Sequence, residues 1–167
     1  MAHSGGKGTT VLVEMFGRYK AEHPGPLALV LVGPVVVEPP PHPDVIVLGQ
    51  VSEPAKWSVL ESALALVCPS FFESLNQSLI EGWARSKPAI VNGHCAATSE
   101  QTELSGAGLT YLDQAGFDRV VSMLLDDAAL RERLGGSGLA YVDANFRWPQ
   151  LIERWGRFAE RVAERAA

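Results

Sequence analysis

The hydrophobic positions of the chain alternate between a helical spacing and a strand-like spacing. From Thr10 onward, apolar residues mark one face of a helix that ends before residue 23, and continuous apolar runs follow at 27–32 and 45–48. A third run, 64–67, comes after the amphipathic segment 55–63. Continuous apolar runs bounded by proline or glycine predict strands buried on both faces, which is typical of a parallel sheet.

The alternation of helix and strand continues through the middle of the chain. The pattern predicts a helix at 77–85, a short strand at 89–91, a loop through Gly93 and a short strand at 109–112. Strands separated by helices of this length form right-handed βαβ units. The sequence therefore predicts an α/β fold, a Rossmann-like, doubly wound parallel sheet of about five or six strands in a single domain.

Helices dominate the C-terminal third, at about 116–125, 128–134, 138–144 and 148–167. The last of them carries apolar residues on one face and four arginines on another, and three glutamates dilute the positive charge. This pattern favours an amphipathic helix packed against the core over a membrane-binding or partner-binding stripe. The apolar residues are Leu151, Trp155, Phe158 and Val162; the charged ones are Arg154, Arg157, Arg161, Arg165, Glu153, Glu160 and Glu164.

Length and composition describe an ordinary globular domain. The 167 residues suffice for one domain or for a piece of a larger enzyme, and 47% hydrophobic residues with a net charge of −5 argue against disorder and give no sign of nucleic-acid binding. No apolar run is long enough to cross a bilayer, and the N-terminus lacks a signal-peptide pattern, so we expect a cytoplasmic protein. Cys68 and Cys95 are expected to be reduced, buried thiols, because two cysteines without a histidine cluster cannot build a structural zinc site.

Candidate chemistry gathers in the loop that follows the third predicted strand. Open α/β sheets bind ligands beyond the carboxyl ends of their strands, and this loop holds Glu73, with Glu81 eight residues later in the next helix. The free N–H groups near Ser74, Leu75 and Asn76 precede that helix and suit a phosphate. Glu81 is then placed to accept hydrogen bonds from the two hydroxyls of a ribose.

These residues belong to a wider pattern. Glu73 and Glu81 follow Pro69-Ser70 and precede Lys87-Pro88, and Gly6-Lys7-Gly8 stands ahead of the first helix. In this order the chain resembles the C-terminal, donor-nucleotide-binding domain of the retaining glycosyltransferases of GT-B fold, in the group called family four. The resemblance covers nearly the whole chain, including Gly49-Gln50-Val51 and the segment 106–109. It implies one domain, residues 1–167, of a two-domain architecture whose N-terminal acceptor domain is not in this chain.

The resemblance also implies roles for individual residues. Lys7 resembles the lysine that neutralises the nucleotide diphosphate, Glu81 the carboxylate that holds the ribose, and Glu73 the catalytic-site residue that contacts the transferred sugar. The amides of Leu75 and Asn76, after Ser74, resemble the phosphate-binding turn. Taken singly, Lys7, Glu73 and Glu81 would each be an ordinary surface residue; their joint order favours the functional interpretation.

Further positions match less closely. Val51 and Lys56 correspond to positions near the nucleotide base and the phosphates. The family normally has an arginine five residues before the lysine, where this chain has Ala2, so one phosphate contact is missing from the pattern. Residues 1–4 are expected to be an expression remnant rather than folded sequence.

The expected function is therefore that of the nucleotide-sugar-binding domain of a retaining glycosyltransferase with a UDP-type or GDP-type donor. The resemblance implies no metal and no cofactor, and its partners are the nucleotide sugar and the missing N-terminal domain. Nucleic acid is not expected, and membrane contact is expected only through the full-length enzyme. Without its other half, the chain should turn over little donor.

Alternative functions are a sugar-nucleotide 2-epimerase half-domain and a non-catalytic nucleotide-binding or interaction module. A P-loop is excluded because Gly8 stands where that motif requires serine or threonine after the lysine, and no GxGxxG fingerprint follows the first strands. His94 and Cys95 are adjacent in sequence, which favours a structural loop over a catalytic cysteine–histidine pair.

Overall fold

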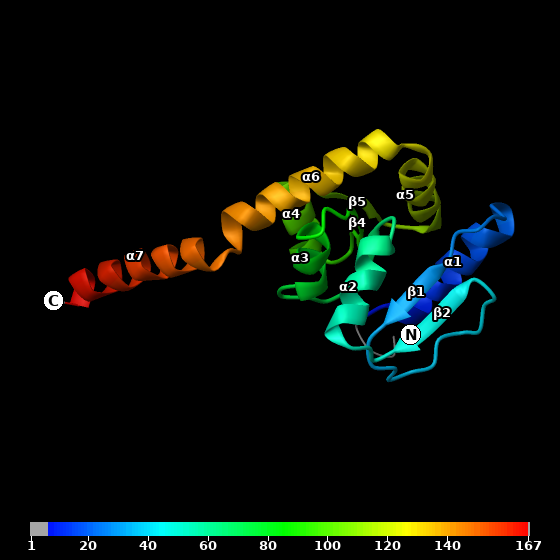
Figure 1. The fold of residues 1–167 in the computed structure, drawn as a ribbon, viewed down its shortest axis with the longest axis horizontal. Coiled ribbons are helices and arrows are strands. Elements are labelled where there is room, and N and C mark those ends of the chain that lie inside the picture. The colour runs from blue at the N-terminus through cyan, green and yellow to red at the C-terminus, as the bar shows by residue number, and fades with distance from the viewer. Residues whose placement is uncertain (1–6, 167) are drawn as a thin grey trace.

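The computed structural model describes residues 7–166, in which strands and helices alternate along the chain (Figure 1). The predicted remnant at 1–4 and the departure at Ala2 lie outside the described residues. The elements are α1 (Thr9–Glu22), β1 (Leu29–Val32), β2 (Val45–Gly49), α2 (Glu53–Ser62), β3 (Leu66–Cys68), α3 (Gln77–Trp83), β4 (Ala89–Asn92), α4 (Ala96–Ser105), β5 (Gly108–Tyr111), α5 (Gln114–Asp126), α6 (Ala128–Asn145) and α7 (Trp148–Ala166).

The strands pair in parallel, which confirms the predicted Rossmann-like α/β class. Their hydrogen bonds form a two-stranded sheet, β1-β2, and a three-stranded sheet, β3-β4-β5, where the sequence predicted one sheet. The registers place Leu29 opposite Val45 in the first sheet, and Ala89 opposite both Leu66 and Gly108 in the second. All carboxyl ends within each sheet therefore meet at one edge, where an open α/β fold places its ligands.

The prediction that the first two strands are buried on both faces is wrong. Val30 of β1 is 38% exposed and Ile46 of β2 is 46% exposed, whereas β4 is buried along its whole length. The cause lies in the connection between β1 and β2, which is the proline-rich loop 33–44 and contains no helix. A parallel pair is usually joined by a helix that covers one face, and this pair lacks that cover.

Two apolar clusters hold the helices against the strands. The first joins α1 to α5 and includes Leu12, Tyr19 and Phe117. The second surrounds Trp83 of α3, which is fully buried and donates a hydrogen bond from its indole N–H to the Ala107 carbonyl at 3.0 Å. This second cluster fixes the position of α3, which forms one wall of the candidate site.

Helix α6 is continuous, although the sequence predicted two separate helices at 128–134 and 138–144. Two glycines of this helix, Gly135 and Gly138, serve close packing. A Cβ on Gly138 would lie 2.7 Å from Cδ1 of Trp83, and one on Gly135 would lie 2.1 Å from the Ser86 carbonyl oxygen. Glycine therefore lets α6 approach α3 closely enough to bury Trp83.

Helix α4 occupies part of the region that the sequence analysis assigned to a loop. Its buried positions are Thr98, Thr102 and Ser105, so the apolar periodicity that would have predicted a helix is absent. The threonine hydroxyls are satisfied locally, since Thr102 donates to the Thr98 carbonyl at 2.7 Å. Hydrophobic spacing therefore does not predict a helix whose buried face is polar.

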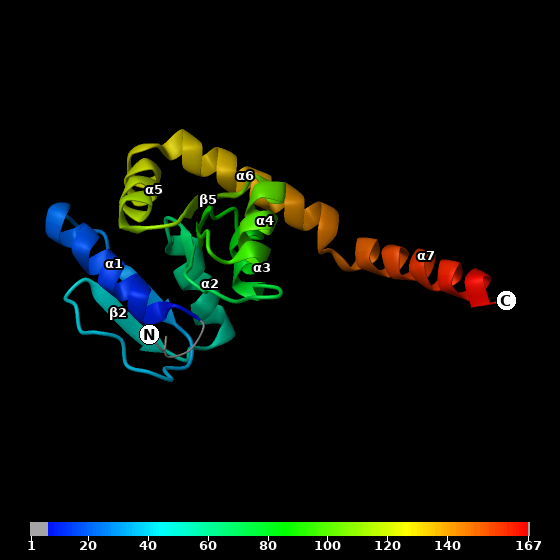
Figure 2. The ribbon, with the colours of Figure 1, turned by 180° about the vertical axis from the view of Figure 1, so that it is seen from behind.

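Helix α7 extends away from the rest of the chain instead of packing on the core (Figure 2). The expectation of core packing is wrong, because Trp155 is 68% exposed and Phe158 is 50% exposed. The chain turns after α6 at Phe146, which ends that helix as its C-cap, and α7 then runs outward. Within residues 7–166, no helix combines the length and the apolar character needed to cross a bilayer.

Candidate functional site

The site begins where the N-terminal segment touches the loop after β3. Gly8 has φ = 70°, a left-handed conformation that favours glycine, and a Cβ there would lie 2.2 Å from the Pro69 carbonyl oxygen. This close approach brings Lys7 to the loop. Its Nζ lies 2.6 Å from Oε1 of Glu73, so two of the predicted site residues form one ion pair.

Glu73 is held in the loop by several donors. Its side chain is 9% exposed, and besides Lys7 the side-chain amide of Asn76 donates to Oε1 at 3.3 Å. Burial acts to raise the pKa of Glu73, but the hydrogen bonds from Lys7 and Ser70 and the charge of Lys7 outweigh it, so the pKa lies below its ordinary value. Glu73 is therefore ionised at neutral pH and fixed in position.

A second ion pair joins Lys56 of α2 to Glu81 of α3. Nζ of Lys56 lies 3.0 Å from Oε1 of Glu81 and 3.0 Å from Oε2 of Glu53, and it lies over the Trp57 ring, 4.4 Å from its centroid. Hydrogen bonds to Glu81 and Glu53 raise the pKa of Lys56, so its charge is retained. The structure thus brings Lys56 to the predicted ribose-binding carboxylate.

The start of α3 uses its own side chain as a cap. Asn76 is the N-cap, and its Oδ1 accepts a hydrogen bond from the backbone N–H of Leu79 at 3.1 Å. Helix α3 has seven residues, so its dipole is short. Ser74 and Leu75 are exposed in the loop just before α3. Lys7 carries a full positive charge and lies next to that loop. Val51 precedes Ser52, the N-cap of α2, and so lies two residues before the first residue of that helix.

Sequence reasoning missed how these residues pair. The Lys56–Glu81 contact joins positions 25 residues apart, and the Lys7–Glu73 contact joins positions 66 residues apart, so no local pattern reveals them. The capping role of Asn76 could have been found, because asparagine before a helix is a frequent N-cap. The hydrogen bond from Ser70 to Glu73 had no signal beyond their proximity in the loop.

The two cysteines are buried, as the sequence predicted. Burial, with a smaller contribution from the charge of Glu73, raises the pKa of Cys68 to about 12, so its thiol is neutral and unreactive at physiological pH. Among residues 7–166, no three histidine, cysteine, aspartate or glutamate side chains gather closely enough to hold a metal ion.

Comparisons with known proteins identify the fold. Sucrose-phosphate synthase (tll1590) from Thermosynechococcus elongatus superposes with a TM-score of 0.74 at 20% identity, over 95% of this chain and 43% of that chain. WaaG, described as a glycosyltransferase involved in lipopolysaccharide biosynthesis, superposes with a TM-score of 0.66 at 16% identity, over 87% of this chain and 42% of that chain. The chain therefore has the Rossmann-like α/β fold of one domain of these GT-B neighbours.

The similarity is one of structure and not of sequence. No family model matches the chain, and no curated protein matches its sequence. The chain spans less than half the length of either structural neighbour. The comparison therefore shows the fold alone, and roles for individual residues must be argued from the geometry of the site.

Proposed function

We propose that this chain is the nucleotide-sugar-binding domain of a retaining glycosyltransferase with a UDP-type or GDP-type donor. The observation that carries the proposal is a pair of ion contacts, Lys7–Glu73 and Lys56–Glu81. Glu73, Lys56 and Glu81 lie on segments that follow the carboxyl ends of strands, and Lys7 lies just before α1. Each contact joins two of the predicted site residues. Ligands of open α/β sheets bind at this edge.

Lys7 is suited to the diphosphate. Its side chain is 73% exposed although its ammonium contacts Glu73, and an ammonium has three donors, so it can contact a phosphate without leaving the carboxylate. Glu73 is held additionally by Asn76 and Ser70, so its position does not depend on Lys7 alone. The loop can therefore accept an anion without rearranging.

Glu81 is suited to the ribose. Lys56 contacts its Oε1, and Oε2 makes no hydrogen bond to any residue among 7–166, so one carboxylate oxygen is available for a sugar hydroxyl. Lys56 in turn is held by Glu53 and the Trp57 ring, which fixes the carboxylate. A carboxylate oriented in this way accepts charge-assisted hydrogen bonds.

In the proposed reaction, the bond between the sugar and the diphosphate breaks, and the diphosphate oxygen keeps the electron pair. The oxygen of an acceptor hydroxyl forms the new bond to the sugar, and the proton of that hydroxyl passes to the leaving diphosphate. Lys7 would stabilise the developing negative charge on the leaving group, which is electrostatic catalysis. Glu73, beside Lys7, would face the sugar. The acceptor and the other half of the cleft would come from a further domain.

Calorimetric titration of this chain with UDP, GDP and ADP tests the proposal. We expect UDP or GDP to bind, and Glu81→Gln to weaken that binding about tenfold, because one charge-assisted hydrogen bond to the ribose is lost. The matched control is Glu61→Gln, since Glu61 is an exposed glutamate paired with Arg85 at 3.7 Å and lies outside the site. Absence of binding, or equal affinity of the parent and Glu81→Gln, would contradict the proposal.

A further inference from the structure

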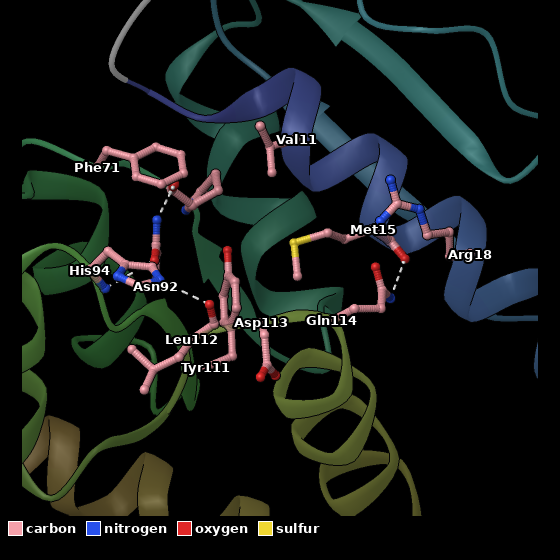
Figure 3. A pocket seen from close by; sticks show the side chains of 11 residues that line it. Val11, Met15, Arg18, Phe71, Asn92, His94, Tyr111, Leu112, Asp113 and Gln114 are labelled. Atoms are coloured by element: carbon pink, nitrogen blue, oxygen red, sulfur yellow. Dashed lines mark hydrogen bonds between the residues drawn. The ribbon is translucent and has the colours of Figure 1, made fainter. Parts of the chain in front are cut away.

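A cavity of about 250 Å³ lies beside the Lys7–Glu73 pair and is used by neither ion pair. It opens at the carboxyl ends of β3, β4 and β5 and is bounded on the opposite side by α1 (Figure 3). Pro69 is the link between the two sites, because it lines the cavity and its carbonyl lies against Gly8, next to Lys7. Anything bound in the cavity would therefore adjoin whatever Lys7 holds.

Tyr111 supplies a hydroxyl group to the wall of the cavity. The residue is 5% exposed. Figure 3 shows the hydroxyl pointing into the space between Asn92 and Met15. Burial raises the pKa of Tyr111 to about 12, so the group stays a neutral donor and acceptor. Oε1 of Gln114, which also lines the cavity, is buried without a hydrogen-bond partner among the described residues. Buried polar atoms usually have a partner, so a ligand in the cavity could supply one for Gln114 and could also contact the Tyr111 hydroxyl.

The remaining walls are partly apolar and partly polar. Val11 and Met15 of α1 form the apolar side. On the other side, Asn92 and His94 are fixed by the backbone: the Asn92 amide donates to the Pro69 carbonyl at 3.2 Å, and Nε2 of His94 lies 2.9 Å from the Leu112 carbonyl oxygen. A cavity with one apolar side and fixed polar groups opposite suits a ring that carries both C–H faces and hydroxyl groups.

A free anion fits the cavity less well. The carboxylate of Asp113 lines it and would repel an anion, while Arg18 has an exposed side chain already facing Glu14, with its guanidinium nitrogen 3.9 Å from a carboxylate oxygen. The volume is also below the range of about 300–1,000 Å³ that holds drug-sized ligands, so a single ring fits better than a whole nucleotide.

We propose that this cavity is the subsite for a sugar ring, with the Tyr111 hydroxyl as its specificity-determining hydrogen-bonding group. This inference rests on the proposed function, because it places the ring on the far side of Lys7 from Glu81. The order along the edge would be nucleoside at Glu81, diphosphate at Lys7 and ring in the cavity. The ring can come from the donor or from the acceptor, and the experiment separates the two.

The experiment uses the chain with Tyr111→Phe, which removes only the hydroxyl and keeps the ring that packs on Phe117 with centroids 5.3 Å apart. Tyr141→Phe is the matched control, since Tyr141 packs on Trp83 and does not line the cavity. Calorimetry compares UDP with UDP-glucose and GDP with GDP-mannose. Ligand-detected NMR then measures the methyl glycosides of glucose, galactose and mannose, with and without saturating nucleotide.

If the ring belongs to the donor, the nucleotide sugar binds the parent more tightly than the nucleotide does, and Tyr111→Phe lowers that gain about threefold to tenfold while leaving UDP and GDP unchanged. If it belongs to the acceptor, the variant loses the same factor for a methyl glycoside instead. Either result supports the subsite, provided that Tyr141→Phe binds the same ligands as tightly as the parent.

Other outcomes overturn the subsite. If UDP or GDP binds but no sugar contributes, or if the sugar contribution is equal in Tyr111→Phe and the parent, the cavity is not a sugar site and the proposed function still stands. If no nucleotide binds, the proposed function fails, and the methyl glycosides alone test the subsite. Glycoside binding that is weaker in Tyr111→Phe than in the parent would support the subsite, and absence of glycoside binding would contradict it.

Discussion

Replacement of Glu73 by glutamine separates the charge of this residue from its shape. The variant keeps an oxygen where Oε1 accepts a hydrogen bond from Asn76, but it loses the negative charge that faces Lys7 at 2.6 Å. The Lys7 side chain is 73% exposed, so solvent screens the pair and it contributes at most about 1 kcal/mol. We therefore expect the free energy of unfolding to fall by about 1 kcal/mol at pH 7.

The effect should depend on pH with a defined sign. Because the folded-state pKa of Glu73 lies below its ordinary value of 4.5, the parent gains stability from ionised Glu73 above that value. This gain is lost as the pH falls through the lowered pKa, and Glu73→Gln never has it. The difference in unfolding free energy between parent and variant should therefore be constant from pH 7 to pH 5 and shrink below pH 4.5.

Urea denaturation followed by tryptophan fluorescence, at several pH values between 7 and 3.5, measures this difference. Glu14→Gln is the control, since Glu14 is exposed and its carboxylate lies 3.9 Å from Arg18. In the same samples, calorimetry should find that Glu73→Gln binds UDP or GDP as tightly as the parent or up to about threefold more tightly, because a negative charge beside the phosphate-binding lysine is gone.

Two results would refute this reasoning. An unfolding difference that stays the same below pH 4.5 would mean that the pKa of Glu73 is not lowered in the folded state. A tenfold loss of nucleotide affinity in Glu73→Gln would mean that Glu73 contacts the nucleotide directly, and its assignment to the sugar side of Lys7 would be wrong.

Three more predictions concern charge, packing and a thiol. Lys7→Ala should lower UDP affinity about tenfold and leave uridine affinity unchanged by calorimetry, because a lysine charge serves phosphate and not base; an equal loss for both ligands contradicts this. Gly138→Ala should cost about 1–3 kcal/mol in urea denaturation, since its Cβ would lie 2.7 Å from Trp83, whereas Gly136→Ala meets nothing within 4 Å and should stabilise the helix by about 0.5–1 kcal/mol; equal effects contradict the packing argument. Because burial raises the pKa of Cys68 from 9.0 to about 12, the unfolding free energy should fall above pH 9, by up to about 1.4 kcal/mol per pH unit, as the thiol ionises in the unfolded chain only. In Cys68→Ala the fall should be smaller, with the contribution of Tyr111, whose pKa is also raised to about 12, remaining above pH 10. An identical pH dependence in both proteins would show that the thiol is not shielded.

The sequence alone determined the class of fold and predicted the place of the site. Helical periodicity located α1 and α5, and continuous apolar runs located the strands, because both patterns depend on residues near one another in the chain. The rule that ligands bind beyond the carboxyl ends of strands selected the loop with Glu73. The spacing of Glu73 and Glu81, with Lys7 before the first helix, then gave the family resemblance, and the structural neighbours support the GT-B fold that it implied.

Only the tertiary structure decided how those residues work together. The Lys7–Glu73 contact depends on Gly8 lying against Pro69, and the Lys56–Glu81 contact depends on α2 lying beside α3. The exposure of β1 and β2 depends on a missing crossover helix, and that of α7 on the absence of a facing surface in residues 7–166. Hydrophobic spacing predicts which face of an element is apolar, but whether another element covers that face is a long-range property that no local pattern contains.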